Sequence, residues 1–293
     1  MSIKSEKFTN TTNKVKGIQP PPEIKQENLG FSDFVHDNDG VVRRHLLFMN
    51  QEAASLCSAP YALSTQLAFR YLWNQGITPR FTPKGDLQLG NTVFSSLKTR
   101  PGGYQIAANG QILLNYRSSK QIAEQVTLTQ FLTGRVNPSA IKDRIVLVGV
   151  TAKGDFPDTW STPYGAFLDE QMPGVLVQAQ MVSQILSAVL DKRPLLRIWS
   201  PWIEVVWIWS WSLTGVLFVW YWRSFPKVAL ALGVSSGVLY LLCFSLLMRG
   251  TWVPYVPSAL ALLGTVGLMS IQNSKAEISK VIDTLRSKDT EIL

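Results

Sequence analysis

Three long apolar stretches near the C-terminal end constrain the fold of this chain more than any other feature. They cover about residues 202–222, 228–248 and 253–271, and the only charged residue among them is Glu204. A helix of about 20 residues crosses the hydrocarbon core of a bilayer and satisfies its own backbone hydrogen bonds there. Helices in the core of a soluble protein rarely reach this length without charges. We therefore predict that residues 199–272 form a bundle of three transmembrane helices.

The aromatic residues and glycines of this region fit the same prediction. Eight of the ten tryptophans lie beyond residue 198, and tryptophans and tyrosines gather at the ends of the three stretches. Such aromatic belts are typical of the membrane–water interfaces. Gly233 and Gly237 form a Gly-x-x-x-Gly step, which lets a second helix approach closely. That step serves either dimerisation or packing within the bundle, and the short connections between the helices favour packing within the bundle.

Basic residues in the flanking segments predict the orientation in the membrane. Six flank the side of the C-terminal end and four flank the other side, namely Arg223, Lys227, Lys275, Lys280, Arg286 and Lys288 against Lys192, Arg193, Arg197 and Arg249. Because cytoplasmic loops carry the excess of Lys and Arg, we expect a multi-pass protein of the cell inner membrane with a cytoplasmic C-terminal end. The preceding soluble unit would then be extracytoplasmic, and its export needs an apolar span that residues 1–29 do not supply. Either that span is missing from this chain or the soluble unit stays in the cytoplasm.

The residues before the apolar stretches divide into two parts. Residues 1–29 lack apolar periodicity and contain three consecutive prolines, so we predict that they are disordered. Residues 30–198 alternate strand-like and helix-like patterns, which predicts an α/β unit with helices packed on a sheet. Strands are expected in VVRRHLLFM, GQILLNYR and the buried run RIVLVGV, and helices in SAPYALSTQLAFRYLWNQG, TLTQFLTG and MPGVLVQAQMVSQILSAVLD.

Composition excludes several classes of function. The net charge is +8, but no run of Lys and Arg exceeds two residues, so we predict no nucleic-acid binding. Cys57 and Cys243 are too few for a disulfide framework or a thiolate metal site. His36 and His45 both precede the apolar stretches, which leaves no phosphoacceptor histidine on the cytoplasmic side. We therefore expect no catalytic activity, no cofactor and no bound metal.

The stretch DRIVLVGVTAKGDFPDTWSTPYG, residues 143–165, contains the best candidate for a binding loop. A phosphate-binding loop would place a lysine after Gly154, where this chain has Asp155, so that reading fails. Loops after the carboxyl end of a sheet strand line the ligand crevice of many α/β proteins. Hydrogen bonds to a small molecule are then expected from four side chains, those of Thr151, Asp155, Asp158 and Thr162. The alternative prediction, of equal weight, is that these side chains only cap turns.

The stretch HDNDGVV contains a second group of polar residues. When Gly40 is aligned with the glycine of a calcium-binding EF-hand loop, Val35 and Leu46 occupy positions that require carboxylates, so the calcium site fails. A hairpin turn is the better prediction, with Arg43 and Arg44 leaving the strand on opposite faces. Either arginine can meet an anionic ligand, although partners within the fold are the ordinary outcome.

The order of several stretches resembles the CHASE2 sensor domain of bacteria and the three helices that follow it, in the form common in cyanobacteria. The resemblance covers most of residues 35–271 and is carried by DNDGVVRRHLLFM, PYALSTQLAFRYL, GGYQIAANGQILLNYRS, TLTQFLTGRVNPSAIKDRIVLVGVTA, DTWSTPYG and MPGVLVQAQMVSQILSAVLDKRPLL. It implies an extracytoplasmic domain that senses a ligand, placed between an N-terminal span and three C-terminal spans. The family usually continues into a cytoplasmic output module.

Three departures from the family pattern stand out. The N-terminal span and the first part of the sensor are absent, so the α/β unit of residues 30–198 is expected to be incomplete. An output module is absent too, and residues 273–293 are expected to form only a short cytoplasmic helical tail. That tail has Ile278, Val281, Ile282 and Leu285 at helical spacing, typical of the start of a coiled coil, but a frayed solvated tail fits equally well. Gln178 stands where the family often carries histidine.

The sequence as a whole predicts a membrane-bound sensory protein without a catalytic output module. Its expected partners are the lipid bilayer, an unknown small-molecule signal, and either a separate signalling effector or a second copy of the chain. The alternative is a non-catalytic membrane subunit whose soluble part is a protein-interaction surface.

Overall fold

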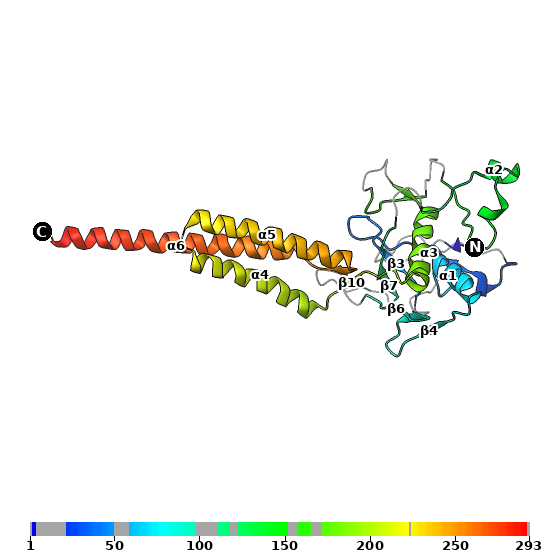
Figure 1. Ribbon diagram of the computed structural model, residues 1–293, viewed down its shortest axis with the longest axis horizontal. Coiled ribbons are helices and arrows are strands. Elements are labelled where there is room, and N and C mark those ends of the chain that lie inside the picture. The colour runs from blue at the N-terminus through cyan, green and yellow to red at the C-terminus, as the bar shows by residue number, and fades with distance from the viewer. Residues whose placement is uncertain are drawn as a thin grey trace, which may run out of the picture. The chain divides into compact units, whose positions relative to one another are not determined.

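The structure is a computed structural model that describes residues 2–3, 22–49, 59–97, 110–117, 122–151, 158–165, 171–222 and 224–291 (Figure 1). The chain divides into two compact units, and the boundary lies between Leu196 and Arg197. Unit 1, before that boundary, mixes helices with short strands, whereas unit 2 contains three long apolar helices. This is the predicted fold class, an α/β unit followed by a three-helix bundle.

The strands of unit 1 form small separate sheets. Antiparallel pairing joins β3 (Arg44–Leu46) to β7 (Gln111–Leu113), β5 (Leu87–Leu89) to both β4 (Pro79–Phe81) and β6 (Thr92–Phe94), and β8 (Thr159–Trp160) to β9 (Met172–Pro173). β3 and β7 lie within VVRRHLLFM and GQILLNYR, so two of the three predicted strands are confirmed. The predicted turn before β3 is confirmed as well, because the Gly40 N–H donates to the Asp37 carbonyl at 2.9 Å.

Two helices supply much of the core of unit 1. α1 (Leu63–Trp73) and α3 (Gly174–Leu190) pack against each other, as Figure 1 shows. α3 buries the face that its sequence predicts. Ile185 and Ala188 of that face join a core cluster with residues of α1, β5, β6 and β7 and with the two residues that follow β3: Leu47, Phe48, Ala68, Leu72, Leu87, Leu89, Phe94, Ile112, Ile185 and Ala188. Burying one leucine or phenylalanine side chain stabilises a fold by about 1.5–3 kcal/mol, so this cluster fixes the relative positions of the helices and strands.

The short helix α2 (Leu128–Leu132) confirms the predicted capped helix. The Thr127 hydroxyl accepts from the Gln130 N–H at 3.2 Å, and the Gln130 side chain accepts from the Thr127 N–H at 2.8 Å. This reciprocal pair is a capping box, which satisfies two donors that the first helical turn leaves free. The apolar side chains of Leu128, Phe131 and Leu132 are all exposed on this helix.

The prediction of a buried strand at residues 144–150 is wrong. Within the described part of the chain this segment joins no sheet, and the Val148 side chain is 92% exposed. Ile145 and Leu147 are half-buried, whereas Val146 and Val150 are exposed. An apolar run indicates a tendency to be buried, but burial also needs a neighbouring strand or helix on both faces, and the sequence pattern does not report one.

Unit 1 also includes part of the N-terminal segment for which disorder was expected. β1 (Ser2–Ile3) pairs in parallel with β2 (Gly30–Phe31), and a short 3-10 helix, η1, covers Gln26–Asn28. Leu29 and Phe31 are buried in a second small core cluster. Residues 4–21 lie outside the described residues, so disorder there stays a prediction.

Unit 2 consists of α4 (Pro201–Tyr221), α5 (Phe225–Met248) and α6 (Tyr255–Glu291). Each helix contains a segment long and apolar enough to cross a membrane, at Pro201–Tyr221, Phe225–Met248 and Tyr255–Ala276. These segments agree with the three predicted spans to within a few residues. The short strands β10 (Arg197–Ile198) and β11 (Thr251–Trp252) pair in parallel just before α4 and α6. α6 then continues as one unbroken helix beyond its apolar segment (Figure 1).

The closest helix contact in unit 2 lies between α4 and α6. A Cβ atom added at Gly215 would lie 3.0 Å from the carbonyl oxygen of Leu262, so the absence of a side chain there lets the two backbones approach. Beside it, the hydroxyls of Ser212 and Thr265 are 2.9 Å apart and hydrogen-bond across the two helices. Small residues and interhelical hydroxyl bonds are the usual means of helix association in a membrane.

The predicted role of the Gly-x-x-x-Gly step within the bundle is wrong. No heavy atom of the described residues outside α5 lies within 4 Å of a Cβ placed at Gly233 or Gly237. The close approach in the bundle uses Gly215 of α4 instead.

Residues Gly233–Gly237 read Gly-Val-Ser-Ser-Gly, which has the spacing of a hydrolase nucleophile motif. That motif requires a strand-to-helix turn, and these residues lie inside α5.

Candidate functional site

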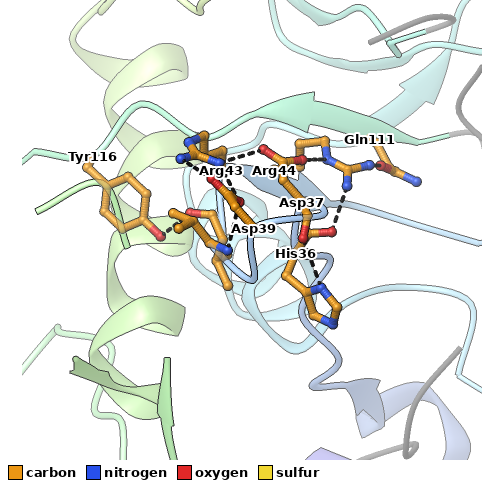
Figure 2. Close-up of polar contacts among 9 residues, drawn as sticks. His36, Asp37, Asp39, Arg43, Arg44, Gln111 and Tyr116 are labelled. Carbon is orange, nitrogen blue, oxygen red and sulfur yellow. Dashed lines mark hydrogen bonds and ion pairs between the residues drawn. The ribbon is translucent and has the colours of Figure 1, made fainter. Parts of the chain in front are cut away.

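Arg44 of β3 lies at the centre of a buried ionic cluster (Figure 2). The hairpin that ends at β3 brings Asp37 beside it, and the Arg44 Nε donates to the Asp37 carboxylate at 2.9 Å. Further donors of the same guanidinium reach the Gln111 side-chain oxygen at 2.7 Å and the His36 carbonyl at 2.9 Å. The Arg44 side chain is only 4% exposed, so these partners replace the water that the charge lost on folding.

Arg43 occupies the outer side of the same cluster. Its guanidinium donates to Asp37 at 3.0 Å and to Asp39 at 2.7 Å, and 41% of its side chain is exposed. The hydrogen bond from Arg43, assisted by the Val41 N–H, lowers the pKa of Asp39 from 3.8 to about 2. The side-chain bond to Asp39 raises the pKa of Arg43 in return. Two arginines therefore balance two aspartates, and both predicted ligand-binding arginines have partners within the fold.

Tyr116 closes the cluster on the side of β7. Its hydroxyl donates to the Val42 carbonyl at 2.8 Å, and its burial raises the pKa of the phenol (Figure 2). The phenol therefore acts as a neutral donor that holds in place Val42, the residue just before the two arginines.

Of the remaining predicted ligand-binding residues, Asp158 lies beside the first turn of α3. The Asp158 side chain accepts from the Trp160 Nε1 at 3.0 Å, and its carbonyl accepts from the Gly174 N–H at 2.8 Å. A carboxylate beside a helix N-terminus is electrostatically favourable. Thr162 is buried and accepts hydrogen bonds within the tight turn of residues 162–165. Thr151 is exposed, and Asp155 lies outside the described residues. Ligand binding by these residues stays a prediction.

A buried histidine of β3 contacts α1. His45 is fully buried, and its Nε2 lies 2.8 Å from the Ser64 hydroxyl. Burial lowers the pKa of His45 from 6.5 to about 3, and the nearby Gln184 side chain of α3 opposes this shift in part. The imidazole is therefore neutral in the folded protein at any pH near neutrality.

This shift predicts acid destabilisation of unit 1. Below pH 6.5 the unfolded chain binds a proton at His45 that the folded chain rejects, so the free energy of unfolding falls as the pH falls towards 3. The expected slope is about 1.4 kcal/mol per pH unit. Calorimetry of the full chain in liposomes between pH 6.5 and 5 measures it. His45→Gln should flatten the slope, whereas His36→Gln, at an exposed position, should leave it unchanged. An equal slope in both variants contradicts the prediction.

Unit 1 has a cavity of about 490 Å³ at a place that the sequence does not indicate. One side is formed by α1, whose residues 67, 70, 71 and 74 follow helical spacing and so share one face. The other side is formed by the segment that precedes Gly149. The cavity is lined by Leu67, Arg70, Tyr71, Asn74, Gln75, Asp143, Arg144, Ile145 and Val146. Its volume falls in the range of about 300–1,000 Å³ that is typical of small-molecule sites.

Asp143 and Arg144 bring opposite charges to this cavity. Asp143 has φ 59°, a left-handed conformation that a residue other than glycine rarely adopts and that aspartate tolerates better than most. The Arg144 N–H donates to the Ile141 carbonyl at 3.2 Å, which holds this turn closed. Arg70 adds a second guanidinium, which donates to the Asn28 side chain. In the described part of the chain, the side chains of Asp143 and Arg144 form no ion pair.

Arg70 and Asn74 of the cavity lie four residues apart at the end of α1, so they share one face. Nothing in the sequence shows that residues 143–146 pass beside that face, because α1 and this segment are far apart along the chain. Among the described residues, no three His, Cys, Asp or Glu side chains are grouped so as to hold a metal ion.

Comparison with known proteins gives one match. A family model described as CHASE2 domain matches residues 3–217, which cover nearly all of unit 1 and most of α4. The match begins inside the N-terminal segment for which disorder was expected. No curated protein and no solved structure matches the chain.

Proposed function

The chain belongs to the CHASE2 domain family, and from that premise we propose that it is a membrane-bound sensor. In this proposal unit 1 binds a chemical signal and the helices of unit 2 carry the response across the membrane. One observation supports it above the others: the family match runs without interruption from unit 1 into α4, the first candidate membrane span. A sensory domain joined directly to a span is arranged to pass a change in its own shape to that span.

The orientation follows from the basic residues. Six of them flank the side of the membrane that holds the end of α6, and four flank the side of unit 1. Because cytoplasmic loops carry the excess of Lys and Arg, this distribution supports an orientation with the C-terminal end in the cytoplasm and unit 1 outside it. A signal outside the cytoplasm would meet unit 1 first under this proposal.

No catalytic step is proposed for this chain. CHASE2 is a sensory domain, and the balanced charges around Arg44 suit a structural role better than acid–base catalysis. The response would therefore pass to a separate effector or to a second copy of the chain on the cytoplasmic side. The exposed side chains of Ile278 and Ile282, one helical turn apart on α6, give a partner helix a surface to contact.

The α4–α6 contact is the element that we expect to move. Its two backbones approach closely at Gly215, and the hydroxyl pair of Ser212 and Thr265 gives one defined register. Packed helices shift between discrete arrangements by about 1–2 Å rather than deforming continuously. Ligand binding in unit 1 would favour one such arrangement of α4 relative to α6.

The proposal is tested with the full chain in liposomes and a panel of small metabolites. A ligand that binds only the folded protein raises the melting temperature of unit 1. At a ligand concentration of 100 times the dissociation constant, the added free energy of unfolding is about 2.7 kcal/mol. The same ligand should change the distance between spin labels at Tyr221→Cys and Ser270→Cys, after the native cysteines are replaced by serine. A ligand that stabilises unit 1 without changing this distance contradicts signal transmission, and a panel with no stabilising compound contradicts sensing.

A second candidate function rests on a different observation. The apolar side chains of Leu128, Phe131 and Leu132 on α2 are exposed, as are those of Val146, Val148 and Val150. Exposed apolar patches on soluble units mark sites of protein contact. Unit 1 would then be the interaction surface of a membrane assembly. Replacing the α2 residues by serine should release a protein partner under this candidate and leave the metabolite response intact under the first.

A further inference from the structure

We infer that the cavity between α1 and residues 143–146 binds a free α-amino acid with an apolar side chain, and this inference rests on the proposed sensory function. In this assignment Arg144 receives the carboxylate of the ligand and Asp143 receives its ammonium group. The apolar part of the ligand lies against Leu67 and Ile145. The argument depends on the charged residues of the cavity, on the absence of ion pairs at Asp143 and Arg144 among the described residues, and on the apolar residues of the cavity walls.

The positive side of the cavity suits a carboxylate. A guanidinium presents a planar pair of N–H donors that matches the two oxygens of a carboxylate. The Arg144 side chain lines the cavity and forms no ion pair among the described residues, so its donors are available to a ligand. Arg70 lies in the same wall, and its bond to Asn28 uses only part of its donor set. Two guanidinium groups beside one cavity therefore favour an anionic group.

The negative side of the cavity selects among anions. The Asp143 carboxylate also lines the cavity and forms no ion pair among the described residues. It would repel a phosphate or a dicarboxylate, whereas an ammonium group beside the carboxylate of the ligand would be attracted. Asp143 and Arg144 are neighbours in the chain, so one wall of the cavity carries both a negative and a positive residue, as an amino-acid zwitterion carries both charges. Matched potentials of this kind give selectivity more than raw affinity.

The remaining walls suit an aliphatic side chain. Leu67 and Ile145 are half-buried and line the cavity from its two sides. Tyr71 adds an aromatic side chain on the side of α1. A volume of about 490 Å³ holds an amino acid of the size of leucine together with some water. Small-molecule sites commonly combine apolar walls with a few polar groups that fix the orientation of the ligand.

The backbone conformation of Asp143 gives the site a rigid anchor. With φ 59° and the turn closed by the Arg144 N–H, the chain changes direction between the two charged residues. Left-handed conformations outside glycine cost free energy and recur at ligand sites. Asparagine adopts the same conformation readily, so Asp143→Asn removes the charge without a change of backbone.

The test is calorimetric titration of the full chain in liposomes with three related probes. L-Leucine carries both charged groups, L-leucinamide lacks the carboxylate, and 4-methylpentanoate lacks the ammonium. We expect leucine to bind and each of the other two to bind at least about tenfold more weakly, which corresponds to about 1.4 kcal/mol. Inorganic phosphate should not compete. Equal binding of leucine and 4-methylpentanoate would remove Asp143 from the assignment, and equal binding of leucine and leucinamide would remove Arg144.

Variants connect the binding to this cavity. Arg144→Gln and Asp143→Asn should each weaken leucine binding by at least about tenfold. Lys142→Gln is the matched control, because Lys142 is an exposed neighbour that does not line the cavity. Undiminished binding in both cavity variants overturns the site. If another metabolite stabilises unit 1 and leucine does not, the amino-acid inference fails while the sensory function stands. If leucine binds at this site without moving α4 relative to α6, signal transmission fails while the inference stands.

Discussion

Replacing Arg44 by alanine is expected to lower the free energy of unfolding of unit 1 by about 3–5 kcal/mol. The substitution removes the inner partner of the Asp37 carboxylate, and it removes the hydrogen bonds that Arg44 donates to the Gln111 oxygen and the His36 carbonyl. Gln111 is buried, so water does not replace its lost donor without rearrangement. Loss of one member of a buried charge pair ranks among the most destabilising single changes, and here it leaves Asp37 with only the half-exposed Arg43 as an ionic partner.

Calorimetry of the full chain in liposomes measures this effect as a fall in the melting temperature of unit 1. For a unit of this size a loss of 3–5 kcal/mol corresponds to a fall of at least about 6 °C. Arg43→Ala is the matched control, because it removes an arginine from the same cluster at a half-exposed position. Half-exposed pairs contribute little, since water and salt screen them. Similar losses in both variants would contradict the distinction between a buried and a peripheral arginine.

Replacing Gly215 by leucine is expected to separate α4 from α6. The first carbon of the new side chain would lie 3.0 Å from the Leu262 carbonyl oxygen and 3.3 Å from Thr265 Cβ, and the rest of the side chain has no space between the helices. The backbone oxygen cannot rotate away as a flexible side chain would. Overpacking of this kind costs about 1–3 kcal/mol, which the helices avoid by moving apart.

A disulfide reports this separation directly. The hydroxyls of Ser212 and Thr265 lie 2.9 Å apart, so cysteines at these two positions should cross-link readily in a background without native cysteines. Gly215→Leu should slow the cross-linking at least about tenfold, the equivalent of about 1.4 kcal/mol. Gly237→Leu is the control, since nothing outside α5 approaches that glycine among the described residues. Unchanged cross-linking in Gly215→Leu would contradict the close backbone approach of α4 and α6 at Gly215.

The elements that the sequence predicted well depend on local pattern alone. The three spans follow from apolar length, the buried face of α3 from helical spacing, and the capped start of α2 from Thr127 and Gln130. Each of these properties is decided within a few turns of chain. They therefore need no knowledge of which distant segment lies alongside.

The elements that it predicted poorly depend on distant partners. Residues 144–150 are apolar enough for a core strand, but no described strand lies beside them, and only Ile145 and Leu147 are half-buried. The two arginines of VVRRHLLFM looked equally available to a ligand, and only the fold shows that Arg44 is buried against Asp37 and Gln111. Arg70 and Arg144 come together at one cavity although nothing in their sequence neighbourhoods relates them.

The unbroken course of α6 has a mechanical consequence. Its 37 residues form a rod about 55 Å long, of which the first part is apolar and the last part polar. Because the hydrogen-bonded ladder has no interruption, we expect a rotation of α6 by about 20° at the bundle to turn the residues beyond its apolar segment as well. Side chains about 5 Å from the axis then sweep an arc of about 2 Å, which reorients Ile278 and Ile282 toward a different neighbour.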